Sequence, residues 1–106
     1  MEIKSQITKE IKQTVLGIDP TAEVILFGSR ARGDFHDESD WDVLVLTDGD
    51  ESEAKMKQKQ IRSSLHALEL DQSEVIYAMV HSHDFWEEKL SGSPLYIEVT
   101  KDGKIL

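Results

Sequence analysis

The sequence has no cysteine and no long apolar run near its N-terminus. Among its 106 residues there is no cysteine, which excludes a disulfide framework and a thiolate metal site. The opening segment, MEIKSQITKEIKQTV, lacks a long apolar stretch, so we expect neither a signal peptide nor a membrane span, and a cytoplasmic location. No repeat, low-complexity segment or linker interrupts the chain, so we expect one small domain over residues 1–106.

Basic residues are the minority among the charged side chains. The chain has 12 basic and 21 acidic residues, with a net charge of −9. Binding nucleic acid without regard to sequence requires basic clusters against the phosphates, so nucleic acid is not the expected partner. An acidic protein can still bind a nucleotide where metal ions neutralise its carboxylates and arginines line the phosphates.

The first half of the chain alternates between helical and strand patterns. Ile3, Ile7, Ile11 and Val15 recur every four residues, which predicts one apolar helix face ending near Gly17 and Pro20. The runs EVILF (23–27) and DVLVL (42–46) are almost continuously apolar, which is typical of strands covered on both faces.

The second half begins with a helix predicted over 52–70, capped by Ser52, with its buried positions at Ile61, Leu65 and Leu68. A third strand, VIYAMV, is predicted over 75–80. A short helix should follow from Ser82 or Asp84, with Phe85 and Leu90 turned inward.

The C-terminal segment SPLYIEVTKDGKIL carries both helix and strand signals. Pro94 suits the first turn of a helix that starts at Ser93, while the β-branched content of YIEVT leaves a strand open as the alternative. Asp102-Gly103 predicts a turn, and KIL predicts a short final strand or a tail.

The segment ILFGSRARGDFHDESDWDVLVL contains the strongest chemical signal in the chain. Because strand side chains alternate faces, Asp40 and Asp42 should project to one side and Trp41 to the other. Two adjacent carboxylates repel each other unless a cation lies between them, and oxygen ligands suit Mg²⁺ together with substrate phosphates. Upstream, Gly28 permits close approach of backbone to a phosphate, and Ser29 adds a hydroxyl. The pattern therefore predicts a metal-assisted nucleotide site.

These residues resemble the Gly-Ser-x10-Asp-x-Asp signature of the polymerase-beta-like nucleotidyltransferase superfamily, at all four fixed positions. Within this superfamily, the short length of the chain and the residues GSRARGD…SDWDVLVL resemble the minimal nucleotidyltransferase group. The resemblance covers residues 21–46 most strongly, and apolar runs flank the motif where the chemistry needs strands. It implies an α/β (α+β) fold with a small mixed sheet packed by helices.

The resemblance also implies a reaction and roles for named residues. An NTP, with ATP expected, would bind at Gly28 and Ser29, with Arg30 and Arg32 as charge partners of the triphosphate. Two Mg²⁺ ions would be held by Asp40 and Asp42. An acceptor hydroxyl would then attack the α-phosphate and displace pyrophosphate.

A two-metal site of this kind uses a third carboxylate from a later strand. Glu74, immediately before VIYAMV, is the expected residue by position, with Asp71 and Glu69 behind it. The superfamily residue is usually Asp, and Glu is longer by one methylene. A charged residue at the open end of a strand is also often only solvated, so both interpretations of Glu74 stay open.

The small size of the chain bears on its partners. Larger relatives in the superfamily carry a helical domain that holds the acceptor, so a partner protein or a second copy of the chain, as a homo-oligomer, would have to complete the acceptor surface. Minimal nucleotidyltransferases are often paired with a helical HEPN protein. The resemblance therefore implies a tyrosine of a HEPN-type toxin as acceptor, and an antitoxin role for this chain.

Two alternatives remain open at this point. The same fold could act as a non-catalytic module that binds a nucleotide or only a partner. A sugar transferase could also use Asp-x-Asp with Mn²⁺, although such enzymes need a larger sheet and have no place for the Gly-Ser spacing.

Other polar residues have a plainer interpretation. His81 and His83 have the spacing of a metal pair but no evident third ligand, so a loop is expected there. His36 and the acidic residues around it are expected in a solvated loop, and Trp41 and Trp86 in packing.

Overall fold

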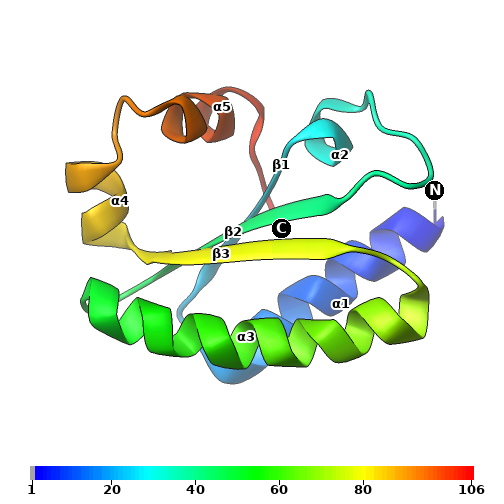
Figure 1. Cartoon of the computed structure of the whole chain (residues 1–106), viewed down its shortest axis with the longest axis horizontal. Helices are drawn as coiled ribbons and strands as arrows, with labels where there is room; N and C mark the ends of the chain where they lie inside the picture. Colours follow the sequence, from blue (N-terminus) through cyan, green and yellow to red (C-terminus); the bar gives the residue numbers. More distant parts are fainter. Residues whose placement is uncertain (1) are drawn as a thin grey trace.

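The computed structural model describes the backbone of residues 2–106 and the side chains of residues 6–106. The elements in chain order are α1 (Glu2–Ile18), β1 (Glu23–Phe27), α2 (Ser29–Arg32), β2 (Trp41–Thr47), α3 (Glu51–Gln72), β3 (Ile76–Ser82), α4 (His83–Lys89), α5 (Pro94–Asp102) and β4 (Lys104–Ile105). Figure 1 shows three layers, with α1 and α3 on one face of a sheet and α2, α4 and α5 on the other. The mixed α/β architecture predicted from the sequence is confirmed.

The sheet has the strand order β3-β2-β1-β4. Strand β1 runs antiparallel to β2 and β4, whereas β2 and β3 are parallel. In this register Asp42 lies opposite Phe27 on one side and Tyr77 on the other. The C-terminal end of β1 therefore lies beside the N-terminal ends of β2 and β3. The Gly-Ser and Asp-x-Asp motifs come together at this end of the strands.

Alternating residues of the central strands fill two separate cores. Val43 and Val45 lie in the core beneath α1 and α3, whereas Leu44 and Leu46 lie in the core beneath α4 and α5. All four side chains are buried. The nearly continuous apolar runs thus arise because both faces of the sheet are covered, as predicted.

The predicted stripe of α1 is confirmed at Ile7, Ile11 and Val15, which are buried against the sheet and α3. Ile3 lies outside the described side chains. The helix continues through Gly17 to Ile18. Asp19 then accepts hydrogen bonds from Thr21 and from Lys57 of α3.

Helix α3 starts earlier than predicted, and its cap is Asp50 instead of Ser52. The Asp50 side chain accepts from the Glu53 backbone N–H at 2.9 Å, and the Glu53 side chain accepts from the Asp50 N–H at 3.0 Å. This reciprocal capping box satisfies two orphan donors, which a cap at Ser52 would leave unpaired. The buried positions Ile61, Leu65 and Leu68 are confirmed.

In the C-terminal third, the structure decides between the helix and strand alternatives that the sequence left open. Ser82 and Ser93 cap α4 and α5 by accepting from Phe85 and Tyr96 backbone N–H groups. The segment after Pro94 is a helix, and Lys104–Ile105 forms a strand beside β1.

Two details of this region differ from prediction. Strand β3 extends to Ser82, so His81 lies in a strand and His83 opens α4. Phe85, which was predicted to turn inward, is only half-buried and stacks on His81 at 5.4 Å between ring centroids, whereas Trp86 is buried, which confirms its predicted role in packing. Among the described helices, none combines the length and the apolar character that a bilayer crossing needs.

Candidate active site

The turn after β1 depends on glycine at position 28. Gly28 has φ 74° and ψ −160°, a region that is nearly restricted to glycine. Its carbonyl accepts from Ala31 and Arg32 N–H groups at 3.0 Å, which starts α2. A Cβ at this position would also overlap the Asp42 carboxylate. The backbone conformation therefore favours glycine at position 28, and the close approach to the Asp42 side chain joins the two motifs.

Asp40 and Asp42 lie at the beginning of β2, next to this turn. Asp42 shares the face of Leu44 and Leu46, whereas Trp41 is buried in the opposite core, as the alternation predicted. Asp40 is exposed and Asp42 is half-buried. Within residues 6–106, neither carboxylate has a hydrogen-bond or ion-pair partner in the structure.

The electrostatics of Asp42 differ from those of an ordinary surface carboxylate. Burial raises the pKa of Asp42 above its usual value, and the nearby charges of Asp40 and Glu98 raise it further, against a lowering by Arg32. A half-buried carboxylate beside like charges is costly to ionise, and a bound cation would remove that cost. The two oxygen-donor side chains fit one hard cation such as Mg²⁺.

Arg30 occupies a different place from the predicted triphosphate contact. Its guanidinium lies 4.7 Å from the Phe35 ring centroid and 4.3 Å from that of Trp41. It donates to the backbone carbonyls of Ser39 and Asp37. The Arg30 side chain is only 4% exposed and lies on the Trp41 side of β2. It fixes the loop that precedes Asp40.

Glu74 is not brought to the Asp40 and Asp42 pair in this structure. Its Oε1 accepts from the Trp41 indole N–H at 2.8 Å and lies 3.6 Å from the Arg30 guanidinium. The position beside Asp42 on β3 is instead held by Tyr77. Among the described residues, no three His, Cys, Asp or Glu side chains form a cluster suited to a metal ion. The expected third carboxylate thus has a structural partner elsewhere.

Arg32 is the cation near Asp42 that the fold leaves at the surface. Its Nε donates to Asp34 at 3.2 Å, and its Nη1 lies 3.4 Å from Glu98 of α5. Glu98 is a site neighbour that the sequence did not indicate, because 66 residues separate it from Arg32 and only the packing of α5 brings it close. His36 is exposed, as expected for a loop residue.

Comparison with known proteins shows the family of this chain. The family model of the nucleotidyltransferase domain matches residues 5–105. The chain belongs to this family. It is accordingly an enzyme of the nucleotidyltransferase class, as the resemblance implied.

Two relatives come from Methanocaldococcus jannaschii. One, named "Putative protein adenylyltransferase MJ0141", is 41% identical over 88 residues, which cover 78% of this chain and 88% of the relative. The other, "Putative protein adenylyltransferase MJ0604", is 33% identical over 84 residues, which cover 79% of this chain and 76% of the relative. This nucleotidyltransferase is thus similar along most of its length to proteins named for transfer to protein acceptors.

Proposed function

We propose that this nucleotidyltransferase moves AMP from ATP to a hydroxyl group of a protein, with Mg²⁺ as its metal. One observation carries the proposal: the Gly28 backbone lies so close to the unpaired Asp42 carboxylate that a Cβ at position 28 would overlap Asp42 Oδ2 unless that side chain moved. A phosphate at the turn and a cation at the carboxylates would therefore be neighbours. The names of the two relatives support AMP as the group and protein as the acceptor.

The roles of the residues follow from their placement. Gly28 and Ser29 would receive the triphosphate, and Arg32 would supply charge to it by leaving Asp34 and Glu98. Arg30 would act indirectly, by positioning the loop before Asp40. Asp40 and Asp42 would hold Mg²⁺, which when bound neutralises phosphate charge and activates the acceptor oxygen.

The reaction asks little covalent chemistry of these side chains. The acceptor oxygen forms a bond to the α-phosphorus, the bond to pyrophosphate breaks, and the hydroxyl proton is released. Positioning and charge neutralisation supply most of the rate in transfers of this kind. The second expected metal ion has no third carboxylate among the described residues, so Asp40 and Asp42 account for one ion.

The acceptor we propose is a tyrosine on a HEPN-type helical partner, whose RNase this chain would silence as an antitoxin. The support for it is the resemblance of the GSRARGD…SDWDVLVL segment to minimal nucleotidyltransferases, together with the protein acceptors in the relatives' names. A homo-oligomer is the other arrangement that would complete an acceptor surface.

A second candidate function is a module that binds nucleotide or partner without transfer. The absence of a third carboxylate beside Asp40 and Asp42, within the described residues, favours it. Transfer of label from α-labelled ATP to tyrosine-containing peptides separates the two. We expect Mg²⁺-dependent transfer that Asp40→Asn lowers about 100-fold or more, with Asp48→Asn, an exposed change of equal charge, as control. Nucleotide binding without any transfer would establish the binding module instead.

A further inference from the structure

The outer edge of β3 is closed by side chains of α3 along most of its length. Because Trp41 N–H donates to Val75 C=O, odd-numbered residues of β3 face β2 and even-numbered residues direct their backbone groups outward. An edge with unpaired N–H and C=O groups is a template for another strand. In this protein five outward groups have a side-chain partner instead.

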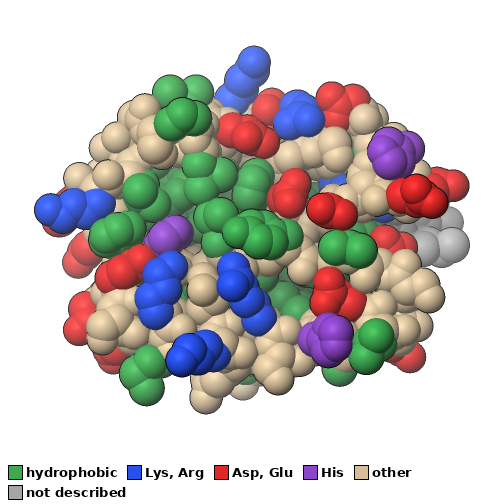
Figure 2. Space-filling model, viewed as in Figure 1, with side chains coloured by type: hydrophobic (Ala, Val, Ile, Leu, Met, Phe, Trp, Pro, Cys, Tyr) green, Lys and Arg blue, Asp and Glu red, His purple; other side chains and the backbone are tan. Residues whose placement is uncertain are grey.

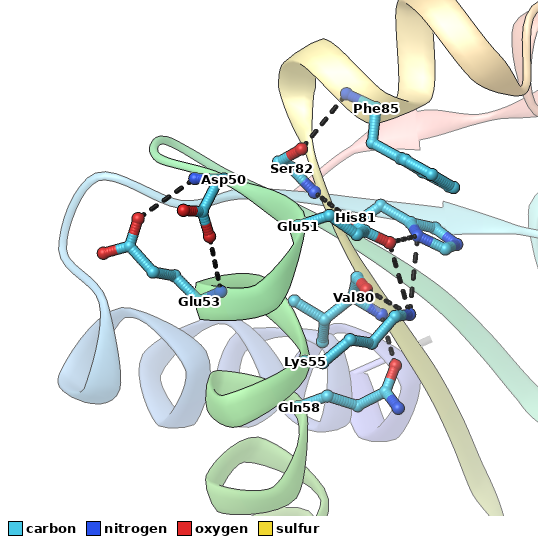
Figure 3. A network of polar contacts seen from close by, with 9 residues as sticks. All are labelled: Asp50, Glu51, Glu53, Lys55, Gln58, Val80, His81, Ser82 and Phe85. Carbon is cyan, nitrogen blue, oxygen red and sulfur yellow. Dashed lines mark hydrogen bonds and ion pairs between the residues drawn. The ribbon is translucent and has the colours of Figure 1, made fainter.

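The partners come from one stripe of α3. Near the end of β3, Glu51 accepts from Ser82 N–H at 2.8 Å, Lys55 donates to Val80 C=O at 2.9 Å, and Gln58 accepts from Val80 N–H at 3.0 Å. Figure 3 shows these side chains reaching from α3 to the strand. The stripe seals this half of the edge against a further strand.

The stripe continues toward the active-site end but leaves one gap. Arg62 donates to Ala78 C=O at 2.7 Å, and Glu69 accepts from Ile76 N–H at 2.8 Å. Between them, Ala78 N–H and Ile76 C=O face outward with no side-chain partner in the described part of the chain. One donor and one acceptor two residues apart are the pair that an extended peptide would match with two hydrogen bonds.

A groove of about 500 Å³ lies over this gap. It is lined by residues of α3 and β3: Arg62, Ser63, Leu65, His66, Glu69, Ile76, Tyr77 and Ala78. The apolar side chains of Val75 and Tyr77 are 55% and 48% exposed beside it. Figure 2 shows hydrophobic side chains gathered along β3 on this face, between basic side chains over α3 and acidic side chains near α2.

The gap is also placed correctly for an acceptor. A strand paired with β3 would lie about 10 Å from β2, at two strand spacings. The peptide residue opposite Tyr77 would share the face of Tyr77 and Asp42, since paired residues project to one side. Among hydroxyl side chains, serine and threonine are too short to cross Tyr77 from there, whereas tyrosine is long enough.

We propose that the β3 edge at Ile76 and Ala78 is the docking site for the acceptor, an extended peptide segment whose tyrosine reaches over Tyr77 toward Asp40 and Asp42. This inference rests on the proposed AMP transfer, and adds to it where the acceptor backbone binds. Along the described edge of β3, α3 side chains occupy the other outward groups and leave Ile76 C=O and Ala78 N–H beside the groove, which fixes the position of the segment.

The test fills the groove from an exposed position of α3. Ser63→Trp places an indole in the groove, whereas Ser64→Trp makes the same change at an exposed neighbour that does not line it. The probe is a pool of blocked nonapeptides with tyrosine at the centre and random flanks without proline or cysteine. Backbone amide NMR with hydrogen exchange follows Ala78, and α-labelled ATP follows transfer to the pool.

In the wild type and Ser64→Trp, we expect the pool to shift the Ala78 amide signal and to slow its exchange. Ser63→Trp should abolish both effects and lower AMP transfer about tenfold, the equivalent of the two lost backbone bonds. Binding of an ATP analogue with Mg²⁺ should be equal in all three proteins. The inference would be overturned if the pool changed neither the Ala78 amide signal nor its exchange in the wild type. Transfer by Ser63→Trp at the wild-type rate would also overturn it.

The analogue measurement keeps the two proposals apart. If all three proteins fail to bind the analogue, the proposed function fails, whatever Ala78 does. If the analogue binds and label reaches the pool equally in all three, the function stands and the β3 docking site is wrong.

Discussion

At the Trp41 end of β2, Asp40 and Asp42 have no partner among the described side chains, whereas at the Ser82 end of β3 Glu51 is fully engaged. Glu51 accepts from Ser82 N–H, contacts His81 Nδ1 at 2.6 Å and lies 3.6 Å from Lys55 Nζ (Figure 3). Each end has a half-buried carboxylate beside it: Asp42 on β2 at one end and Glu51 of α3 at the other. The difference is that Glu51 has internal partners at one end, whereas Asp40 and Asp42 at the other end have none among the described side chains.

The pKa values follow this division in opposite directions. For Glu51, burial alone would raise the pKa, but the Ser82 N–H bond, then His81 and Lys55, outweigh it and hold the pKa below its usual value. For Asp42, burial and then Asp40 and Glu98 raise the pKa. Internal partners stabilise a fold, and a half-buried acid without them is the kind of group to which the proposed function assigns metal binding.

The largest effect should come from Gly28→Ala. The glycine-only backbone region and the overlap with Asp42 together should lower the free energy of unfolding by about 2–4 kcal/mol and abolish ATP-analogue binding. Gly33→Ala is the matched control, because Gly33 has φ 91° but open space around a Cβ, and should cost about 1–2 kcal/mol. Urea unfolding of both variants measures this. If both variants lose the same free energy of unfolding, the overlap with Asp42 does not contribute to the cost of Gly28→Ala.

The opposite end is tested by Glu51→Ala. Removing the acceptor of Ser82 N–H and the partner of His81 should lower the free energy of unfolding by about 1–3 kcal/mol without changing nucleotide affinity. Glu88→Ala, an exposed change on α4, should stay within about 0.5 kcal/mol. A loss of nucleotide binding in Glu51→Ala would contradict the separation of the two ends.

Charge-neutral variants should shift stability with opposite signs. Because the folded pKa of Glu51 is depressed, its contribution is present above its unfolded pKa near 4.5 and is lost as pH falls through the folded value, so Glu51→Gln should lower Tm at pH 7. Because the folded pKa of Asp42 is raised, its stabilising protonation is complete below about 3.8 and is lost as pH rises, so Asp42→Asn should raise Tm at pH 7. Both differences should shrink in acid. Differences of the same sign at pH 7 would refute the contrast.

The smallest effect should come from Glu98→Gln at the rim of the site. Its ion pair with Arg32 joins side chains that are 40% and 38% exposed, so unfolding should change by less than about 0.5 kcal/mol. Affinity for the ATP analogue should rise about twofold to threefold at low salt, because one negative charge near the phosphates is removed and Arg32 is released. Added salt should remove this gain in affinity, because it screens the charges. A gain that persists at high salt would contradict an electrostatic cause.

The sequence was informative where local pattern decides structure. Spacing alone predicted the α1 stripe, the two covered strands and the side of Trp41, because side-chain period follows directly from helix and strand geometry. Ser82, as one of two candidates, and Ser93 were predicted as helix starts, and both side chains accept the capping hydrogen bond, because helix initiation is local chemistry.

The differences arise where tertiary contacts compete. Arg30 follows the Gly-Ser turn in sequence, yet two aromatic rings and two loop carbonyls hold it in place. Glu74 lies at the expected strand end, yet the Trp41 indole binds it on the other face. Glu98 and the gap in the α3 stripe depend on the packing of helices, which no window of sequence contains.

The most direct test is calorimetric titration of a non-hydrolysable ATP analogue into wild type, Asp42→Asn and Asp48→Asn, each with and without Mg²⁺. The account predicts Mg²⁺-dependent binding in the wild type and in Asp48→Asn, and its loss in Asp42→Asn together with a higher Tm. Binding that survives in Asp42→Asn, or that ignores Mg²⁺ in the wild type, would contradict the assignment of Asp42 as the carboxylate that the fold leaves free for metal and nucleotide.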